Sequence, residues 1–364
     1  MSYSLDPLTA PVYSVKEGNG WRAVFNPDAR RQMDVQPYLS YVHKGVVCCV
    51  RFSADGSLLA VGTDNAVVLY DLKQQINTSF PLGSEEESGE ARKANHARSV
   101  IISPDNKLLV AGSEDKYIRV WNLETGEFLR TLSGHRGEVY ALAFTSDSGT
   151  LLTASGDRTV RVWDATQFSA EVLEPSCRVL CPTKLEEKSS KLVFTSVSVD
   201  ASGSFVAAGS LDGMIRVWDI RPASGKEDPV GVLQGHTDGV YGIQFLPSGM
   251  GSSVMSLVSA SLDRTLKRWE ILPDEKQFLC KKTLSGHTDA VLSASLLQVG
   301  REERLASSSR DGTVRLWDLK TGMPYFMIQG HTNTVTSVDL SSDGTLLASG
   351  SGDHTVRIWK YNLQ

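Results

Sequence analysis

The chain has 364 residues, is 41% hydrophobic and 22% charged, and carries a formal net charge of −5 at pH 7. Its length would suit about two or three domains, and its acidic balance argues against direct DNA binding, which requires clustered lysine and arginine. No apolar run approaches the roughly 20 residues that span a bilayer, and Met1–Pro7 lack the basic and apolar regions of a signal peptide. Five cysteines without framework spacing suit a reducing compartment, so we expect a cytoplasmic or nuclear protein without membrane contact.

One motif recurs seven times along the chain: an aspartate followed six residues later by an aromatic residue. Successive aromatic residues are 42 to 55 residues apart, and six of the seven tryptophans take part, Trp21 being the exception. A period of this length indicates a repeat architecture rather than independent domains. The seven pairs are Asp64 with Tyr70, Asp115 with Trp121, Asp157 with Trp163, Asp212 with Trp218, Asp263 with Trp269, Asp311 with Trp317, and Asp353 with Trp359.

Within each repeat the local pattern is typical of β-strands. Residues 139–144 and 159–163 alternate with period two and are rich in β-branched and aromatic residues, and turn residues such as Asp147-Ser148-Gly149 separate the strands. Each repeat is therefore expected to form a small antiparallel sheet that cannot bury both faces alone. Radial packing of several sheets would cover these faces and leave only short edges.

The Gly-His to Trp-Asp units resemble the WD-repeat family. Gly134-His135, Asp157 and Trp163-Asp164 form one such unit, and the resemblance covers residues 43–364. It implies an all-β fold, a seven-bladed β-propeller of four-stranded antiparallel sheets. It also implies a hydrogen-bonded frame in which the histidine bonds the turn aspartate and a serine or threonine links that histidine to the tryptophan indole.

The ends of the chain predict how the ring closes. Only residues 360–364 follow Trp359, too few for another strand and turn, whereas residues 34–41 precede the first repeat where other units carry an outer strand. We predict that this strand, part of the N-terminal segment 1–42, completes the last blade. Pro37 fits an outer edge strand, where a missing backbone donor is tolerated.

The complete frame occurs in four units. Serine, histidine and aspartate together could suggest a hydrolase triad, but a fourfold arrangement favours a structural role because catalysis needs one site. We therefore expect no catalytic residue and no enzyme activity. The four sets are His135, Thr153, Asp157 and Trp163; His236, Ser259, Asp263 and Trp269; His287, Ser307, Asp311 and Trp317; and His331, Ser349, Asp353 and Trp359.

The other three units lack parts of this frame, and we expect them to be less rigid. Unit one has His43 but Ala60 and Tyr70, unit two has Lys93 and Ala111, and unit four has Ser190 and Ala208 at the corresponding positions. His96 and His354 lie outside the frame, and His354 is expected to be a solvated loop residue.

No phosphate-binding loop, nucleophile elbow or metal-ligand cluster is visible in the sequence. Cys48 and Cys49 are adjacent on a predicted inner strand and therefore point to opposite faces. Cys177 and Cys181 have too few neighbouring histidines or cysteines for a zinc site. We expect no metal and no cofactor, so function should lie on the surface.

The face that carries the frame histidines and aspartate turns is the best candidate for binding, because loops on a rigid scaffold concentrate recognition. Tyrosine, leucine and arginine are typical of interface centres and would suit a peptide or short helix of another protein. Alternatively, the two tyrosines pack between blades and the charges are solvated. The candidate residues are Cys48, Lys116, Tyr140, Arg158, Leu211, Tyr241, Leu262, Arg264, Leu292, Arg310, Asn333 and Thr336. The acidic segment 84–90 is expected to be a solvated loop.

Several segments resemble the fungal Tup-type transcriptional corepressors, which are related in function to Groucho. The most discriminating are the Cys48-Cys49 opening, Asn26-Pro27 and the Trp359-Lys360-Tyr361 ending. The other similar segments are residues 34–35, 46–53, 98–100, 155–164, 207–212, 350–353 and 357–361.

This resemblance implies a nuclear corepressor propeller that docks on DNA-bound transcriptional repressors and acts through histones, histone deacetylases and a tetratricopeptide-repeat corepressor. It places Cys48, Tyr140, Leu211, Tyr241 and Asn333 where such a propeller meets repressor peptides. Residues 1–42 show no heptads and so do not supply the family's helical oligomerisation segment. The alternative is another WD-repeat adaptor, such as a ubiquitin-ligase substrate receptor or a chromatin-complex scaffold. An enzyme using the channel would need converging carboxylates with raised pKa.

Overall fold

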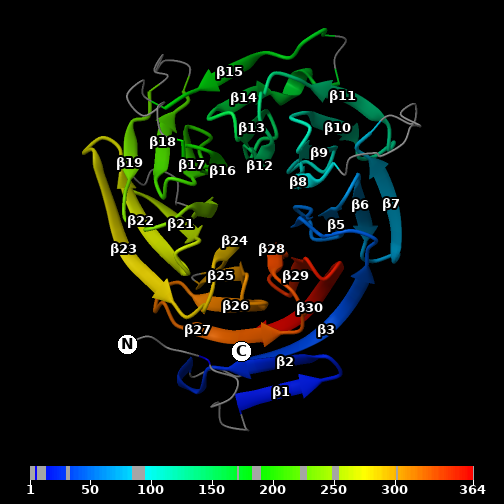
Figure 1. Ribbon diagram of the computed structural model, residues 1–364, viewed down its shortest axis with the longest axis vertical. Coiled ribbons are helices and arrows are strands. Elements are labelled where there is room, and N and C mark those ends of the chain that lie inside the picture. The colour runs from blue at the N-terminus through cyan, green and yellow to red at the C-terminus, as the bar shows by residue number, and fades with distance from the viewer. Residues whose placement is uncertain are drawn as a thin grey trace.

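Seven antiparallel sheets are arranged in a ring around a central channel in the computed structural model (Figure 1). The structure describes residue 5 and residues 14–29, 33–83, 95–169, 172–182, 190–221, 228–247, 254–300 and 302–363. Within these residues the regular structure is β, apart from short 3-10 helices at Pro27–Ala29 and Ala165–Gln167. The expected seven-bladed propeller is confirmed. The acidic segment 84–90 and Lys93 lie outside the described residues.

Each blade runs from an inner strand beside the channel to an outer strand at the rim, and in blades 1 to 5 the four strands follow chain order. Blade 1 comprises β4 (Cys49–Phe52), β5 (Leu58–Gly62), β6 (Ala66–Asp71) and β7 (Ile76–Pro81). Blade 2 comprises β8 (Ala97–Ile102), β9 (Leu108–Ser113), β10 (Ile118–Asn122) and β11 (Phe128–Leu132). Blade 3 comprises β12 (Val139–Phe144), β13 (Thr150–Ser155), β14 (Val160–Asp164) and β15 (Cys177–Leu180). Blades 4 and 5 comprise β16 (Phe194–Val199), β17 (Phe205–Ser210), β18 (Ile215–Asp219) and β19 (Gly231–Leu233); and β20 (Val240–Phe245), β21 (Met255–Ser261), β22 (Thr265–Leu272) and β23 (Gln277–Ser285).

Blades 6 and 7 receive strands from the start of the chain. Blade 6 contains β24 (Val291–Val299), β25 (Glu302–Ser309), β26 (Thr313–Asp318) and β27 (Pro324–Gln329), and blade 7 contains β28 (Val335–Leu340), β29 (Leu346–Ser351), β30 (Thr355–Leu363) and β3 (Met33–Val42). β3 pairs with β30 from Met33 opposite Leu363 to Val42 opposite Thr355, which confirms the predicted closure. The register shifts next to Pro37, so the residue without an N–H lies at a bulge on an edge strand.

An N-terminal hairpin extends blade 6 beyond the four strands expected for every blade. β1 (Val15–Gly18) pairs with β2 (Trp21–Phe25), and β2 pairs with β27, which makes a sheet of six strands. The Trp21 ring packs edge-to-face against Trp359 of blade 7 with 5.9 Å between centroids, and Asn26 donates a buried hydrogen bond to the Pro324 carbonyl. Trp21 falls outside the repeat because it belongs to this additional hairpin.

The hydrophobic core lies between the blades. Seven buried clusters each join one blade to its neighbour around the ring. Between blades 2 and 3, for example, Val120 and Leu132 meet Leu142, Phe144 and Trp163. Because alternate side chains of a strand point to opposite faces, each sheet contributes to two such layers. Stacking around a ring therefore buries both faces of every blade.

The two ends of the channel differ in how their turns are built. At the end opposite the frame histidines, the turn after several inner strands is held by its own side chains. Ser53, Ser103, Thr145 and Ser341 each donate a 2.6 Å hydrogen bond to the aspartate two residues later. These local hydrogen bonds leave that face with short, self-contained turns. Within the described part of the chain, no helix is long and apolar enough to cross a membrane.

Candidate protein-binding face

Four blades contain a continuous hydrogen-bonded chain from the aspartate turn to the tryptophan. In blade 5, His236 Nδ1 lies 2.7 Å from Asp263 Oδ2, His236 Nε2 lies 2.7 Å from Ser259 Oγ, and the Trp269 indole donates to the same Ser259 Oγ over 2.8 Å. The sets centred on His135, His287 and His331 have the same three links. A neutral imidazole fits each set, with Nδ1 donating and Nε2 accepting.

Burial and hydrogen bonding act in opposite directions on these groups. Burial alone would raise the pKa of each turn aspartate. The hydrogen bonds from the histidine and from further donors outweigh burial. The pKa therefore lies well below its usual range in Asp157, Asp263, Asp311 and Asp353. Burial lowers the pKa of His287, with partial opposition from Asp311. The turn aspartates are therefore ionised near neutral pH, and in blade 6 burial favours the neutral form of His287 beside Asp311.

Blades 2 and 4 hold the same aspartate with arginine. Arg119 Nη2 lies 2.5 Å from Asp115 Oδ2, and Arg216 Nη2 lies 2.8 Å from Asp212 Oδ2, each arginine following its aspartate by four residues. Asn95 also donates to Asp115 over 2.7 Å. The guanidinium thus supplies the donors that histidine supplies elsewhere. The sequence shows that the histidine and the hydroxyl are missing in these two blades, but this replacement was not predicted from it.

Blade 1 follows neither pattern. His43 Nε2 lies 3.2 Å from the Tyr70 hydroxyl, and the structure places no hydrogen bond between His43 and Asp64. Asp64 instead faces His96 at the start of blade 2, with Nδ1 and Oδ1 2.5 Å apart. His96 is therefore paired across the boundary between two blades.

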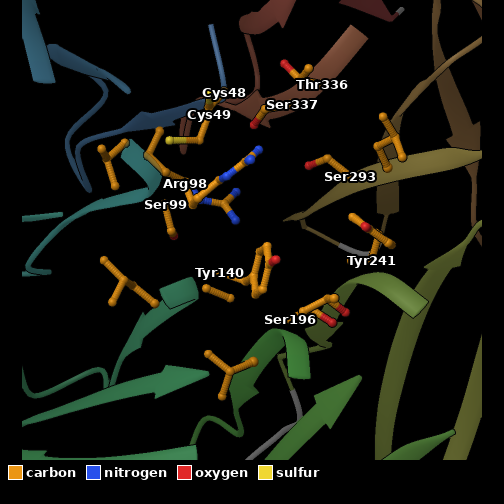
Figure 2. Close-up of a pocket in the computed structure, with 18 of the residues that line it drawn as sticks. Cys48, Cys49, Arg98, Ser99, Tyr140, Ser196, Tyr241, Ser293, Thr336 and Ser337 are labelled. Atoms are coloured by element: carbon orange, nitrogen blue, oxygen red, sulfur yellow. The ribbon is translucent and has the colours of Figure 1, made fainter. Parts of the chain in front are cut away.

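A cavity of about 340 Å³ opens at the channel, between the inner strands (Figure 2). Figure 2 shows Arg98 and Tyr140 projecting into it, with Tyr241 and Thr336 at its margin. In every blade, the residue five positions after the frame histidine or its counterpart is among those that line the cavity. These seven positions are Cys48, Arg98, Tyr140, Thr195, Tyr241, Leu292 and Thr336.

Backbone irregularity explains why these side chains face the channel. In six blades the inner strand changes register with its neighbour across this same residue, as between Val139 and Ala141 on either side of Tyr140. A β-bulge turns the extra residue away from the regular alternation. The preceding residue, Val139 in blade 3 and Val240 in blade 5, is fully buried. The bulge therefore separates a packing position from a channel position.

The structure brings together five of the twelve predicted binding residues in the cavity wall: Cys48, Tyr140, Tyr241, Leu292 and Thr336. The others belong to turns and loops on the frame side. Lys116, Arg158 and Arg264 are exposed and have positive φ angles of 76°, 71° and 70°. Leu211 and Leu262 both lie beside Gly239. A Cβ atom added to this glycine would lie 3.0 Å from a methyl group of Leu211 and 3.4 Å from a methyl group of Leu262. Arg310 and Asn333 are exposed, and Asn333 donates to the Gly352 carbonyl over 3.4 Å.

Arg98 and Thr195 were missed by the sequence analysis. Both occupy the channel position of blades without a frame histidine, so counting five residues from Lys93 and Ser190 would have found them. Burial disfavours the charge on Arg98, but its ion pair with Glu114 outweighs this and raises its pKa. Thr336 has a structural bond as well, because its hydroxyl donates to the Val47 carbonyl of blade 1 over 2.6 Å.

The cavity wall offers recognition groups. It combines two tyrosines, two leucines, two arginines and several hydroxyls, which together provide apolar area and hydrogen-bond donors. Burial raises the pKa of Cys48 to about 11, so its thiol is protonated near neutral pH and is a poor nucleophile. This chemistry suits non-covalent binding of a polypeptide.

The chain matches the family model described as WD domain, G-beta repeat, at residues 36–71, 92–122, 126–164, 180–219, 227–270, 278–318 and 322–360. It is similar to the transcriptional repressor rco-1 of Neurospora crassa, with 37% identity over 98% of this chain and 57% of the relative. It is also similar to the general transcriptional corepressor TUP1 of Saccharomyces cerevisiae, with 32% identity over 98% of this chain and 56% of the relative.

Similarity extends to WD-repeat proteins with other names. Apoptotic protease-activating factor 1 of Danio rerio is 27% identical over 94% of this chain and 27% of the relative. The chain thus spans between about a quarter and just over half of the length of these curated relatives. Seven matched repeats and seven closed blades agree in number and position. The chain belongs to the WD-repeat family.

Proposed function

We propose that this propeller is a protein-docking module of a nuclear transcriptional corepressor and performs no catalysis itself. The observation that carries the proposal is the similarity to two fungal proteins named as a transcriptional corepressor and a transcriptional repressor, which spans 98% of this chain in both cases. This similarity includes the N-terminal region that supplies β1 to β3. The similarity to apoptotic protease-activating factor 1, at 27% identity, supports only the repeat architecture.

The proposed docking surface is the frame-side face around the cavity. Tyr140, Tyr241, Leu211 and Leu262 would bury apolar groups of a repressor peptide, and Arg98 with the exposed basic turn residues would contact its polar groups. DNA-bound repressors are the primary partners. Histones, histone deacetylases and a tetratricopeptide-repeat corepressor are the further partners that we propose for the protein in the nucleus.

The proposal is tested by capture from nuclear extract on the immobilised chain, with mass spectrometry of the retained proteins. We expect sequence-specific transcriptional repressors to be retained by the wild type and lost with Tyr241→Ala or Leu211→Asp. Matched controls are Tyr38→Ala and Leu279→Asp, because Tyr38 is 46% and Leu279 41% exposed on outer strands. All four variants should melt at the wild-type temperature.

Two outcomes would contradict this proposal. Retention of the repressors by all four variants would place docking elsewhere on the protein. Retention of ubiquitin-ligase subunits in place of transcriptional proteins would favour the substrate-receptor interpretation.

A further inference from the structure

A cysteine, an aspartate and a histidine converge where blade 1 meets blade 2. His96 Nδ1 lies 2.5 Å from Asp64 Oδ1 and 4.0 Å from Cys48 Sγ. One ligand atom from each residue lies within 4.8 Å of the other two. The backbone holds the trio in place, because Asp64 and His96 form an isolated β-bridge and the Cys48 N–H donates to the Gly62 carbonyl over 2.9 Å.

Asp64 differs from the other turn aspartates in its hydrogen bonding. Its counterparts accept hydrogen bonds from a histidine or arginine of their own blade, as Asp157 does from His135. Among the described residues, none donates a hydrogen bond of acceptable geometry to Asp64 Oδ1, although this atom is buried and His96 is close. A buried carboxylate oxygen without a donor is costly unless a cation or another group satisfies it.

We propose that Cys48, Asp64 and His96 bind a Zn²⁺ ion that joins blades 1 and 2. Sulfur, imidazole nitrogen and carboxylate oxygen are the donors that zinc prefers, and three protein ligands leave a fourth position for water or a partner's side chain. The sequence alone does not mark this trio, because its members are separated by 16 and 32 residues and follow no metal-binding motif. This inference does not depend on the proposed function.

A second layer of charge orients the histidine. His96 Nε2 lies 3.9 Å from Glu114 Oε2, so the carboxylate faces the ring nitrogen that is not the proposed ligand atom. Arg98 of the cavity wall is itself paired with Glu114. Glu114 is therefore a positioning residue for the site.

Binding requires only small movements. Bond lengths of about 2.0–2.3 Å in a tetrahedron separate nitrogen from oxygen by about 3.3 Å and nitrogen from sulfur by about 3.6 Å. The present separations of 2.5 and 4.0 Å would each change by less than an ångström through side-chain rotation. The His96 and Asp64 side chains are 27% and 29% exposed, which gives an ion access from solvent.

The test is titration of the purified full chain with Co²⁺, a spectroscopic substitute for Zn²⁺. We expect one equivalent to bind and to produce the near-ultraviolet charge-transfer band of a thiolate ligand, and Zn²⁺ to displace it. Cys48→Ser should abolish the band, whereas Cys280→Ser, which removes an exposed cysteine elsewhere, should retain it. Glu114→Gln should weaken Zn²⁺ binding by about 10- to 100-fold in competition titrations.

Calorimetry provides a second readout, because zinc binds the thiolate and the Cys48 thiol must therefore release its proton when zinc binds. The measured enthalpy should therefore depend on the ionisation enthalpy of the buffer. Absence of a thiolate band in the folded wild type, or a band that Cys48→Ser retains, would overturn the proposal. So would a band lost only with Cys280→Ser, since binding would then be adventitious.

Discussion

Blades 4 and 5 are neighbours with the same repeat, yet they hold its aspartate with different side chains. Blade 5 uses His236, whose side chain is fully buried, and links it through Ser259 to Trp269. Blade 4 uses the charged Arg216, whose side chain is 2% exposed, and the Trp218 indole donates to the Cys181 carbonyl instead. A repeat that lacks the family residues therefore still has a satisfied aspartate turn. The lower rigidity expected for such blades stays a prediction.

The largest expected effect comes from removing the turn aspartate of blade 4, which is held by an arginine. Asp212→Ala removes the carboxylate paired with a buried guanidinium, and we expect a loss of about 3 kcal/mol in the free energy of unfolding, measured by urea denaturation. The double variant Asp212→Ala/Arg216→Met removes the charge as well and should recover part of this loss. A single variant as stable as the wild type would mean that the ion pair does not hold the turn.

The corresponding change in blade 5, where a histidine holds the turn aspartate, should lower the free energy of unfolding by less. Asp263→Ala leaves neutral donors of His236, Thr237 and Thr265 without their acceptor, and we expect a loss of about 2 kcal/mol in the same experiment. A loss larger than that of Asp212→Ala would reverse the order on which the comparison depends.

The two kinds of blade should also differ in their response to pH. Burial holds the pKa of His287 in blade 6 below its unfolded value of about 6.5. Folding stability is therefore unaffected by this histidine above about pH 6.5. As pH falls below that value, the free energy of unfolding decreases by up to about 1.4 kcal/mol per pH unit. Arg216 stays charged throughout this range.

Hydrogen exchange between about pH 8 and 5 separates these responses, once corrected for its intrinsic pH dependence. Amides of β25 and β26 should lose protection as pH falls, while those of β17 and β18 should not, and His287→Gln should remove the dependence. Equal loss in both blades would point to global rather than local opening.

The smallest effect concerns a feature that both kinds of blade share. The residue after the turn aspartate has positive φ in blades 2 and 5, where it is Lys116 and Arg264, and in blade 4, where it is Gly213. Relief of this strain should make Lys116→Gly and Arg264→Gly more stable by about 0.5–1 kcal/mol in thermal unfolding. Alanine at either position should give no gain. Gly213→Ala should destabilise, because its Cβ would lie 3.1 Å from the His236 carbonyl; a neutral result there would refute the explanation.

The repeat period made the ring and its closure predictable, because the spacing places each aspartate, such as Asp263, in a turn and its aromatic residue, such as Trp269, on the strand that follows. The N-terminal hairpin was not predictable, since β1 and β2 lie outside the period and only β2 pairs with a strand of the repeats, β27. Five channel residues followed from counting after the histidine, whereas Arg98 and Thr195 had no histidine to count from. The β-bulges at six of these seven channel residues leave no signal in the sequence.

The central claim is that the frame-side face around the cavity binds a protein partner while the frame behind it supplies rigidity. The most direct measurement is hydrogen exchange of the whole chain with and without a purified repressor recovered by the capture experiment. We predict new protection at the channel residues Tyr140 and Tyr241 and at the turns that hold Leu211 and Leu262. Protection confined to the opposite turns, such as Ser53–Leu58, or to the outer strands would contradict the account.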